Sequence, residues 1–510
     1  MSQWEVKRFQ CISHSANHPA DIIAASLQNP PGQRPSSHQL LAHPFGSAYD
    51  QCMQARLLLA RETGDFGAHD LARTITSDLI RSFAPAPHHR FVGEPPIGQR
   101  VVAHANGIGS IALDKFDGRI LLSGGADGSI RLWDLEQGAH PLRPHDFRPL
   151  SSIVRGVAGG HTHGITHLAF FPFDPDAFLS SSYDKSIKLW STQRCALTAS
   201  FDLNATVYSH ATSPIADHLL VACATQHSNV RLVDLKSGSA LQALVAHGGP
   251  VLCTSWSPRK EHILASGHAD GKIRLWDVRR AGGVIAQLDQ DDTRGFDPAA
   301  DRVPPFDASA HAHNEPVNGL QWTDDGRFIV SAGLDRRIRV WDASTGANTL
   351  ASFGSLVQNQ QVKTASFIIT PSALSAHQDI IFWPNDHEIL AYDLHRGNLV
   401  TRLRSPGSSN PVAARGVNAS RNRITSIAWR GAGGGGRLIG PVMGGGNSFG
   451  AIYSSHHDGQ VRAWMPSVPG PNDIDDADDE LGEDDEVKSR KRKAVDDAYR
   501  SLMGKKVTFA

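Results

Sequence analysis

The stretch Ser123-Gly-Gly-Ala-Asp127-Gly-Ser-Ile-Arg-Leu-Trp133-Asp134 decides the fold of this chain of 510 residues. In it, the Ser precedes the Asp by four residues and the Trp follows the Asp by six. Self-similarity at a fixed spacing indicates a repeat architecture, in which each repeat is one supersecondary unit. Four further stretches keep the same spacing: Ser180, Asp184 and Trp190; Ser266, Asp270 and Trp276; Ser331, Asp335 and Trp341; and Ser454, Asp458 and Trp464.

Each repeat has the residue pattern of short antiparallel strands. Apolar residues alternate with polar ones, as at Ile130 and Leu132, which predicts half-buried strands. The Asp-Gly pairs that begin at Asp127, Asp270 and Asp458 favour tight hairpin turns. Four repeats also carry a histidine about 22 residues before the Asp, followed by an apolar run: His104, His163, His247 and His313. This spacing predicts a unit of four strands without a helix.

Two weaker copies fill the gaps in the series. One covers about residues 207–234 and has Val233 in the position of the Trp. The other covers about 364–393, keeps Asp386 and has Tyr392 six residues later. The total is seven, which predicts an all-β, seven-bladed β-propeller, because radial closure protects the strand edges of an open sheet. A linear solenoid is the alternative architecture.

The repeated His, Ser, Asp and Trp residues allow two interpretations. A catalytic triad uses His, Ser and Asp, but it is needed once, whereas this set recurs from repeat to repeat. We therefore expect a structural tetrad in which Trp donates to Ser, Ser bonds His and His reaches Asp, so that each buried polar group is satisfied. We predict no catalytic residue and no cofactor.

Metal and phosphate sites are also not expected. The pairs His161-Thr-His163 and His311-Ala-His313 could ligate a metal, but no carboxylate or Cys lies at a companion spacing. The Gly-rich run at 431–446 has no following Lys-Ser/Thr and no helix, so a flexible loop is the expected reading.

Composition limits the function classes. The five cysteines are scattered and never spaced as C-x-x-C, which argues against a disulfide framework and favours a reducing compartment. No apolar stretch approaches the roughly 20 residues of a membrane span, so we expect no membrane partner. The formal net charge is -1, which gives no reason to expect strong direct binding of nucleic acid.

At the repeated Asp-x-x-Ile-x-Leu-Trp-Asp the chain resembles WD-repeat proteins, a likeness that implies fold but not function. More specific segments resemble the Cockayne syndrome A (CSA) family over about residues 56–465. They are Thr206-Val-Tyr-Ser-His210 with Ser213-Pro214, Ser255-Trp-Ser-Pro-Arg259, Leu275-Trp-Asp-Val-Arg-Arg-Ala281 with Leu288-Asp-Gln290, and Thr345-Gly-Ala-Asn-Thr-Leu350.

This resemblance implies a non-enzymatic substrate receptor of a cullin-4 RING ubiquitin ligase. The role it implies is transcription-coupled nucleotide excision repair in the nucleus. The implied partners are the adaptor called damaged-DNA-binding protein one, the Cockayne syndrome B ATPase and stalled RNA polymerase II.

The resemblance also implies where the adaptor docks. Trp276-Asp-Val-Arg279 resembles the Trp-Asp-x-Arg box of adaptor-binding propellers, although an exposed Arg after an ordinary strand is the simpler explanation. Residues 57–64 and 71–80 have apolar residues at helical spacing and can form two short docking helices, or helices that pack on their own propeller. The expected adaptor-binding residues are Leu58, Leu59, Arg61, Leu71, Arg73, Ile75, Leu79, Asp277 and Arg279.

We expect four regions: a disordered extension at 1–55, a helical adaptor-docking segment at 56–85, the propeller at 88–466 and a disordered tail at 467–510. Met53 could be the true start of translation. Residues between Phe91 and Val102 are expected to add the outer strand that closes the last blade, and 282–310 form a polar insertion.

The tail is acidic at 473–486 and then basic at 488–493, which resembles a nuclear-import signal or is simply a solvated charge run. Two other functions stay open for the whole chain. One is a nuclear scaffold in chromatin or RNA processing without a ligase. The other is a propeller hydrolase that uses residues in the central channel.

Overall fold

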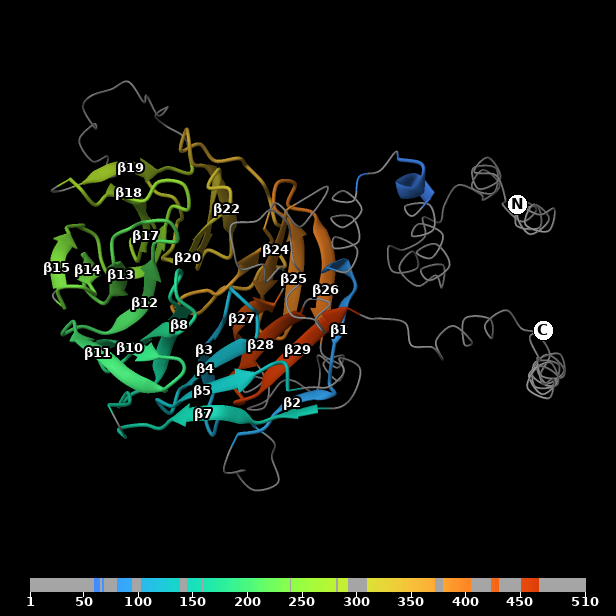
Figure 1. Cartoon of the computed structure of the whole chain (residues 1–510). Helices are drawn as coiled ribbons and strands as arrows, with labels where there is room; N and C mark the ends of the chain where they lie inside the picture. The colour runs from blue at the N-terminus through green and yellow to red at the C-terminus, as the bar shows by residue number, and fades with distance from the viewer. Residues whose placement is uncertain are drawn as a thin grey trace, which may run out of the picture. The chain divides into compact units, whose positions relative to one another are not determined.

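The computed structural model describes residues 59–64, 67, 80–93, 102–137, 145–157, 159–238, 240–280, 283–291, 310–371, 379–404, 423–430 and 451–466. Within these ranges the strands form seven antiparallel sheets, which are arranged as the blades of a propeller, and one further sheet of two parallel strands (Figure 1). The expected all-β, seven-bladed fold is therefore confirmed. In each of blades 1 to 6 the strands follow the order of the sequence from the centre of the ring outward.

The bounds of the strands in blades 1 to 4 are as follows. Blade 1 has β3 (Ile108–Leu113), β4 (Ile120–Gly125), β5 (Ile130–Asp134) and β7 (Pro149–Ile153); blade 2 has β8 (Ile165–Phe170), β9 (Ala177–Ser182), β10 (Ser186–Ser191) and β11 (Ala196–Asp202); blade 3 has β12 (Val207–Thr212), β13 (Leu220–Thr225), β14 (Val230–Asp234) and β15 (Ala240–Leu244); blade 4 has β16 (Val251–Trp256), β17 (Ile263–His268), β18 (Ile273–Asp277) and β19 (Val284–Leu288).

Blades 5 to 7 are less regular. Blade 5 has three strands in the described residues, and Asn348 adds a single bridge to Trp341. The bounds are β20 (Val317–Trp322), β21 (Phe328–Gly333) and β22 (Ile338–Asp342) in blade 5; β23 (Ile368–Ile369), β24 (Ile380–Pro384), β25 (Glu388–Asp393) and β26 (Leu399–Arg404) in blade 6; and β27 (Ile424–Arg430), β28 (Ala451–His456), β29 (Val461–Pro466) and β1 (Phe83–Pro85) in blade 7.

The Asp of each repeat caps a turn between the second and third strands. In blade 1, Asp127 Oδ1 accepts the backbone N–H of Ser129 at 2.9 Å, which closes the turn over the intervening residue. That residue, Gly128, has a φ of +85°, a conformation that glycine adopts without steric cost. Blades 2 and 5 place Lys185 and Arg336 in the same left-handed position. The Asp is therefore needed for the turn itself, as the Asp-Gly pattern indicates.

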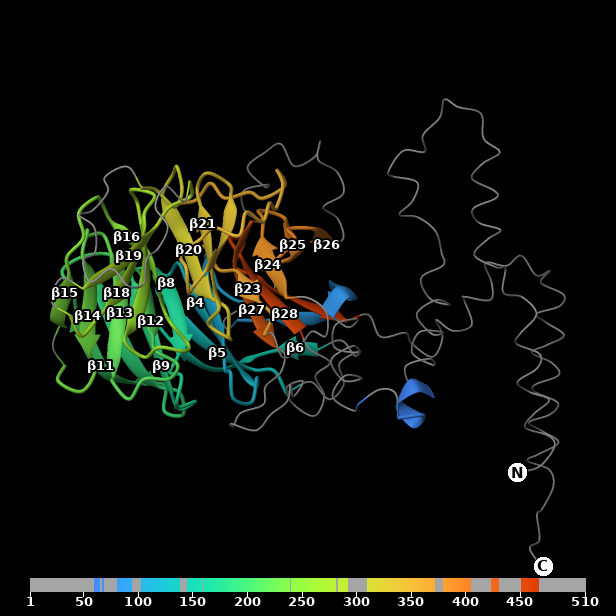
Figure 2. The ribbon, with the colours of Figure 1, turned by 90° about the horizontal axis from the view of Figure 1, so that it is seen from above.

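The hydrophobic core is divided into seven clusters, and each cluster joins two neighbouring blades. Trp190 of blade 2 packs with Leu122 and Ile130 of blade 1, and Trp276 of blade 4 packs with Leu232 of blade 3. Each repeat Trp thus faces the preceding blade, and burying aromatic side chains of this size dominates core energetics. Because every blade needs its neighbour to cover this face, the seven blades stabilise one another around a closed ring (Figure 1). Figure 2 shows the same blades from the side.

The two weaker copies use the same packing with smaller or different side chains. Val233 of blade 3 lies in the cluster shared with blade 2. Tyr392 of blade 6 lies in the cluster shared with blade 5. The blade position therefore requires an apolar residue facing the preceding blade, and the Trp is one solution to that requirement.

The strand that closes the ring differs from the expected one. Strand β1 pairs with β29, and Phe83 lies opposite Pro466 (Figure 1). The prediction that residues between Phe91 and Val102 form this strand is wrong. Phe91 instead ends β2 (His89–Phe91), which pairs in parallel with β6 (His145–Phe147), and its ring stacks on Phe147. Phe91 is thus held in the cluster between blades 7 and 1.

Residues 59–62 form a short helical turn, and the N–H of Thr63 donates to the carbonyl of Leu59 at 2.9 Å. This turn belongs to a compact unit separate from the propeller, which lies within Phe66–Asn472. In the part of the chain that the structure describes, no helix is long and apolar enough to cross a membrane.

Candidate functional site

Five blades contain a buried hydrogen bond between the Trp and the Ser of the repeat. The indole Nε1 donates to the Ser Oγ at 2.7 to 2.8 Å in every copy, and these Ser residues are fully buried. The pairs are Trp133 with Ser123, Trp190 with Ser180, Trp276 with Ser266, Trp341 with Ser331 and Trp464 with Ser454. Each bond ties the third strand to the second, because the two residues lie on neighbouring strands.

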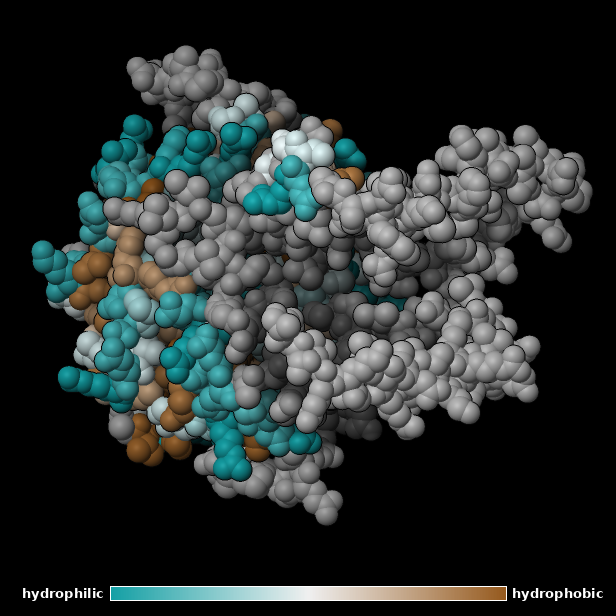
Figure 3. All heavy atoms as spheres, turned by 45° about the vertical axis from the view of Figure 1, so that its right-hand side comes forward, coloured by the Kyte–Doolittle hydropathy of each residue, from teal (hydrophilic) through white to brown (hydrophobic). Residues whose placement is uncertain are grey.

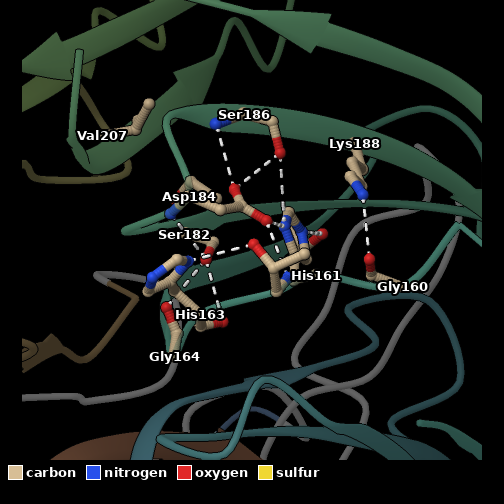
Figure 4. A network of polar contacts seen from close by, with 12 residues as sticks. Gly160, His161, His163, Gly164, Ser182, Asp184, Ser186, Lys188 and Val207 are labelled. Atoms are coloured by element: carbon tan, nitrogen blue, oxygen red, sulfur yellow. Dashed lines mark hydrogen bonds and ion pairs between the residues drawn. The ribbon is translucent and has the colours of Figure 1, made fainter. Parts of the chain in front are cut away.

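A histidine reaches the same Ser in each of these blades, but not always the expected one. His104 contacts Ser123 at 2.7 Å and His313 contacts Ser331 at 2.8 Å, as the sequence pattern predicts. In blade 2, His161 contacts Ser180 at 2.7 Å. The assignment of His163 to this network is wrong, because His161 and not His163 lies against Asp184 (Figure 4).

The chain turns away from the network directly after His161. Thr162 donates its N–H to Asp184 Oδ2 at 3.1 Å, which leaves His163 exposed with its ring nitrogen against the Thr162 hydroxyl. His161 Nδ1 lies 2.7 Å from Asp184 Oδ2, and Ser186 donates to the other carboxylate oxygen (Figure 4). Blade 2 therefore has the full chain of contacts from Trp through Ser and His to Asp.

The assignment of His247 in blade 4 is also wrong. His268, two residues after Ser266 on the same strand, contacts that Ser at 2.8 Å, whereas His247 is exposed. Arg274 takes the place of the histidine next to the turn and donates to Asp270 at 2.9 Å. Its other bond, at 2.7 Å, goes to the carbonyl of His247.

Blade 7 uses the same second arrangement. His456 lies two residues after Ser454 and contacts it at 3.0 Å, while Arg462 donates to Asp458 at 3.0 Å. The Ser-x-His spacing at Ser266 and Ser454 is present in the sequence and could have identified these two histidines. Blade 5 combines both forms, because Asp335 contacts His313 and also accepts from Arg339.

The surroundings shift the pKa values of the Asp side chains in these networks. Burial by itself raises the pKa of Asp184, but hydrogen bonds from His161 and Ser186 outweigh it and hold the pKa well below its ordinary value. Burial raises the pKa of Asp458 above its ordinary value, and the bonds from Gln460 and Arg462 do not compensate. The buried networks are consistent with a structural role, because five blades repeat them and none stands alone.

The predicted docking box lies where β18 turns into β19, at the end of the blades that we call the bottom. Asp277 holds Arg279 by two parallel bonds, from Nε at 3.0 Å and from Nη2 at 2.8 Å. The hydrogen bond from Arg279 lowers the pKa of Asp277 to about 2. The side chain of Asp277 is 5% exposed and that of Arg279 is 62% exposed, so a buried carboxylate positions an outward-facing guanidinium.

Blade 1 repeats this geometry with a different donor. Arg119, from the connection between β3 and β4, donates to both oxygens of Asp134 at 3.0 and 2.7 Å. Asp134 occupies the place of Asp277 after its own Trp. Two arginines on the bottom of the ring are thus held in fixed orientations with free N–H groups.

The other residues that we expect to bind the adaptor stay a prediction. Leu59 and Arg61 lie on the helical turn 59–62, whose unit has no defined position relative to the propeller. Five predicted residues fall outside the described residues: Leu58, Leu71, Arg73, Ile75 and Leu79. The same holds for the Met53 start, most of the 282–310 insertion, the Gly-rich run and the charged tail.

Side chains suited to metal binding do not gather in the described part of the chain, where no group of three or more His, Cys, Asp or Glu residues is formed. Exposed large apolar side chains are dispersed over the blades. On the face shown in Figure 3, hydrophilic and hydrophobic side chains are interspersed.

Comparisons with known proteins agree with this architecture. The model of the WD domain, G-beta repeat, matches residues 97–134, 153–191, 238–277 and 307–342. WD repeat-containing protein ATCSA-1 of Arabidopsis thaliana is 27% identical over 409 residues, which cover 68% of this chain and 86% of that protein.

Two shorter similarities point in different directions. Radiation-sensitive protein 28 of Saccharomyces cerevisiae is 25% identical over 36% of this chain and 38% of its own length. Ribosome biogenesis protein ytm1 of Emericella nidulans is 26% identical over 46% of this chain and 53% of its own length. With four matched repeats, five Trp–Ser bonds and seven blades in the described residues, the chain is a WD-repeat β-propeller protein.

Proposed function

We propose that this propeller is a CSA-type substrate receptor of a cullin-4 RING ubiquitin ligase, acting in transcription-coupled nucleotide excision repair. The observation that carries the proposal is the extent of the similarity to ATCSA-1, which covers 86% of that relative. The similarity to ytm1 covers 53% of the relative and 46% of this chain. A common repeat explains a partial match, whereas a match over most of both chains also includes the connections between repeats.

The bottom of blade 4 supports docking to the adaptor, damaged-DNA-binding protein one. Because Asp277 uses two N–H groups of Arg279, the remaining N–H groups point into solvent in a fixed orientation. A positioned guanidinium loses little conformational freedom when it binds a carboxylate. Arg280 on the same turn is 71% exposed and adds positive charge beside it. This surface suits acidic groups on a partner.

The opposite end of the blades, which we call the top, is then available for substrate. Connections between successive blades and the Asp turns lie there, as expected for a propeller that presents loops to partners. We propose the Cockayne syndrome B ATPase and stalled RNA polymerase II as the proteins recruited to it. Nuclear location follows from this role and from the basic cluster at 488–493. The chain itself performs no bond chemistry, and ubiquitin transfer takes place on other subunits.

Affinity purification of the full chain from nuclear extract tests the proposal. We expect the adaptor and cullin-4 to co-purify with the wild type and with Arg155→Ala, which removes an exposed arginine from the top. Arg279→Ala should reduce recovery of both, because it removes the positioned guanidinium. Recovery of neither protein with the wild type would contradict the proposal.

A scaffold function without a ligase is the second candidate, and the partial similarity to ribosome biogenesis proteins favours it. In that case the same purification recovers ribosome-assembly, chromatin or RNA-processing proteins instead of the adaptor. The two functions are therefore separated by one mass-spectrometric measurement.

A further inference from the structure

In the part of the chain that the structure describes, one segment before blade 6 lies among the inner strands that surround the central channel. Blade 6 has an inner strand of two residues, Ile368–Ile369, and the residues before it line the channel cavity. Thr364 Oγ1 donates to the carbonyl of Leu252 in blade 4 at 3.0 Å. Asn318 of blade 5 donates to the carbonyl of Lys363 at 3.0 Å. We call residues 361–367 the channel segment.

The channel segment places a lysine against the inner strands of blades 1 and 7. Lys363 Nζ donates to the carbonyl of Gly109 in blade 1 and to that of Thr425 in blade 7, the latter at 3.3 Å. An ammonium group has three N–H donors, so one remains after these two bonds. The lysine lies beside a cavity of about 240 Å³ that is lined by the inner strands of the blades and by the channel segment.

The charge of this lysine is not balanced inside the cavity. No Asp or Glu is among the described residues that line it. Burial lowers the pKa of Lys363 and the nearby positive charge of Arg423 acts in the same direction, and together they bring this pKa to about 8. Buried charges in proteins are usually paired, because removing an ion from water without a partner is costly. A bound anion would supply the missing charge.

Two buried imidazole nitrogens in the same lining also lack partners. His167 Nδ1 and His210 Nε2 have no hydrogen-bond partner in the described part of the chain, and the centroids of the two rings lie 4.7 Å apart. His210 is 2% exposed. Ser181 Oγ lies 3.1 Å from His210 Nδ1 and 3.4 Å from the carbonyl oxygen of His167, so its one hydrogen can go to either acceptor. When the hydroxyl donates to His210, the neutral imidazole carries its proton on Nε2, and in this tautomer the Nε2 N–H is a donor without an acceptor in the described part of the chain.

The hydroxyl groups of the lining divide into two kinds. Most of them donate to backbone carbonyls, as Thr166 does to Val207 at 2.7 Å and Ser366 does to Ile427 at 3.2 Å. Ser110 Oγ accepts the N–H of Leu168 at 3.2 Å, so its own hydrogen can point into the cavity. The ammonium group of Lys363, the Ser110 hydroxyl and the Nε2-protonated form of His210 can therefore all donate hydrogen bonds to a ligand in the cavity.

We propose that the channel cavity binds a small oxyanion of the phosphate or sulfate class, held by Lys363 Nζ, His210 Nε2 and the Ser110 hydroxyl. The cavity volume corresponds to several water molecules at roughly 30 Å³ each, which is room for a tetrahedral oxyanion with water. The anion links the channel segment to blades 1 and 3, so it stabilises the ring from its centre. This inference is independent of the proposed ligase function.

Calorimetric titration of the full chain with inorganic phosphate, at ionic strength held constant with sodium chloride, tests the site. We expect saturable binding of one phosphate and a melting temperature that rises with phosphate but not with chloride, since a ligand that binds the native state stabilises it. Sulfate should bind as well. Absence of saturable phosphate binding, or equally tight binding of acetate, would overturn the assignment.

A matched pair of lysine variants locates the anion. Lys363→Met removes the ammonium group with little change of shape, and we expect affinity to fall at least tenfold. Lys185→Met, at an exposed turn of blade 2, should bind phosphate like the wild type. Equal affinity in Lys363→Met and Lys185→Met would place the phosphate elsewhere and refute the proposal.

Lys363→Met could fail to fold, because the lysine also ties blade 1 to blade 7. A second experiment then uses the wild-type protein and follows the NMR resonances of the His210 ring nitrogens during a phosphate titration. Phosphate should shift the Nε2 resonance while sodium chloride leaves it unchanged. A phosphate titration that leaves the ring nitrogens of His210 unmoved would overturn the site as well.

Discussion

Phe83 lies opposite Pro466, so a strand from the N-terminal side of the propeller completes the blade that contains its C-terminal strand. The ring of Phe83 packs edge to face on two other rings. Its centroid lies 5.8 Å from that of Trp429 and 6.2 Å from that of Phe382 in blade 6. This one side chain thus joins the closing strand to two blades. Closure removes the exposed strand edge that would otherwise remain.

Replacing Phe83 with alanine should destabilise the propeller by about 3 to 5 kcal/mol, the usual cost of truncating a buried Phe. Urea denaturation followed by tryptophan fluorescence measures this change. Phe173→Ala is the matched control, because Phe173 is 49% exposed. An equal effect of the two substitutions would contradict the closure by β1.

The two neighbouring histidines of blade 2 give a sharp contrast. His161→Ala leaves Ser180 and the buried Asp184 without their partner, and we expect a loss of roughly 1 to 3 kcal/mol in the free energy of unfolding. His163→Ala changes an exposed side chain and should stay within about 0.5 kcal/mol of the wild type. The reverse order in urea denaturation would show that His163 is the network residue.

Ser331 of blade 5 takes part in two buried hydrogen bonds, one with Trp341 and one with His313. Ser331→Ala removes the acceptor of Trp341 and the partner of His313, so two buried groups lose their bonds. We expect a destabilisation of about 1 to 3 kcal/mol. Ser355→Ala, at an exposed position, serves as the control in the same denaturation experiment. Equal free energies of unfolding for Ser331→Ala and Ser355→Ala would rule out the network.

The buried histidines predict a pH dependence of stability. Burial lowers the pKa of His104, His268 and His313, so the folded state favours their neutral forms. The unfolded chain takes up these protons below about pH 6.5. The contribution of these neutral histidines to the free energy of unfolding is therefore present above pH 6.5 and is lost as the pH falls below it.

Urea denaturation at pH 7.5, 6.0 and 5.0 should show this loss, well before carboxylates near pH 4 begin to contribute. His313→Asn, which removes one titrating group, should reduce the slope between pH 6.5 and 5.0. A stability that rises as the pH falls through this window would contradict the predicted direction.

Much of the fold could be predicted because the same physical requirement recurs in each repeat. The Ser, Asp and Trp positions serve a bond between strands, a turn and a face against the preceding blade, so their spacing is fixed. Val233 and Tyr392 were also identified, since the position only requires an apolar side chain there. Repetition makes such positions visible in one sequence.

The remaining features depend on tertiary contacts that spacing does not encode. His161 and His163 both suit the expected distance from the Asp, and the direction of the chain after Thr162 decides between them. The closing strand at Phe83 is three residues long and has no repeat partner. Nothing in the sequence pattern indicates that Lys363 enters the channel, because blade 6 departs from its repeat at that point.

Titration of the full chain with the purified adaptor, damaged-DNA-binding protein one, tests the central claim most directly. The account predicts a saturable complex, at least tenfold weaker binding by Arg279→Ala, and unchanged binding by Arg155→Ala. No complex with the wild type, or equal affinity of wild type and Arg279→Ala, would contradict it.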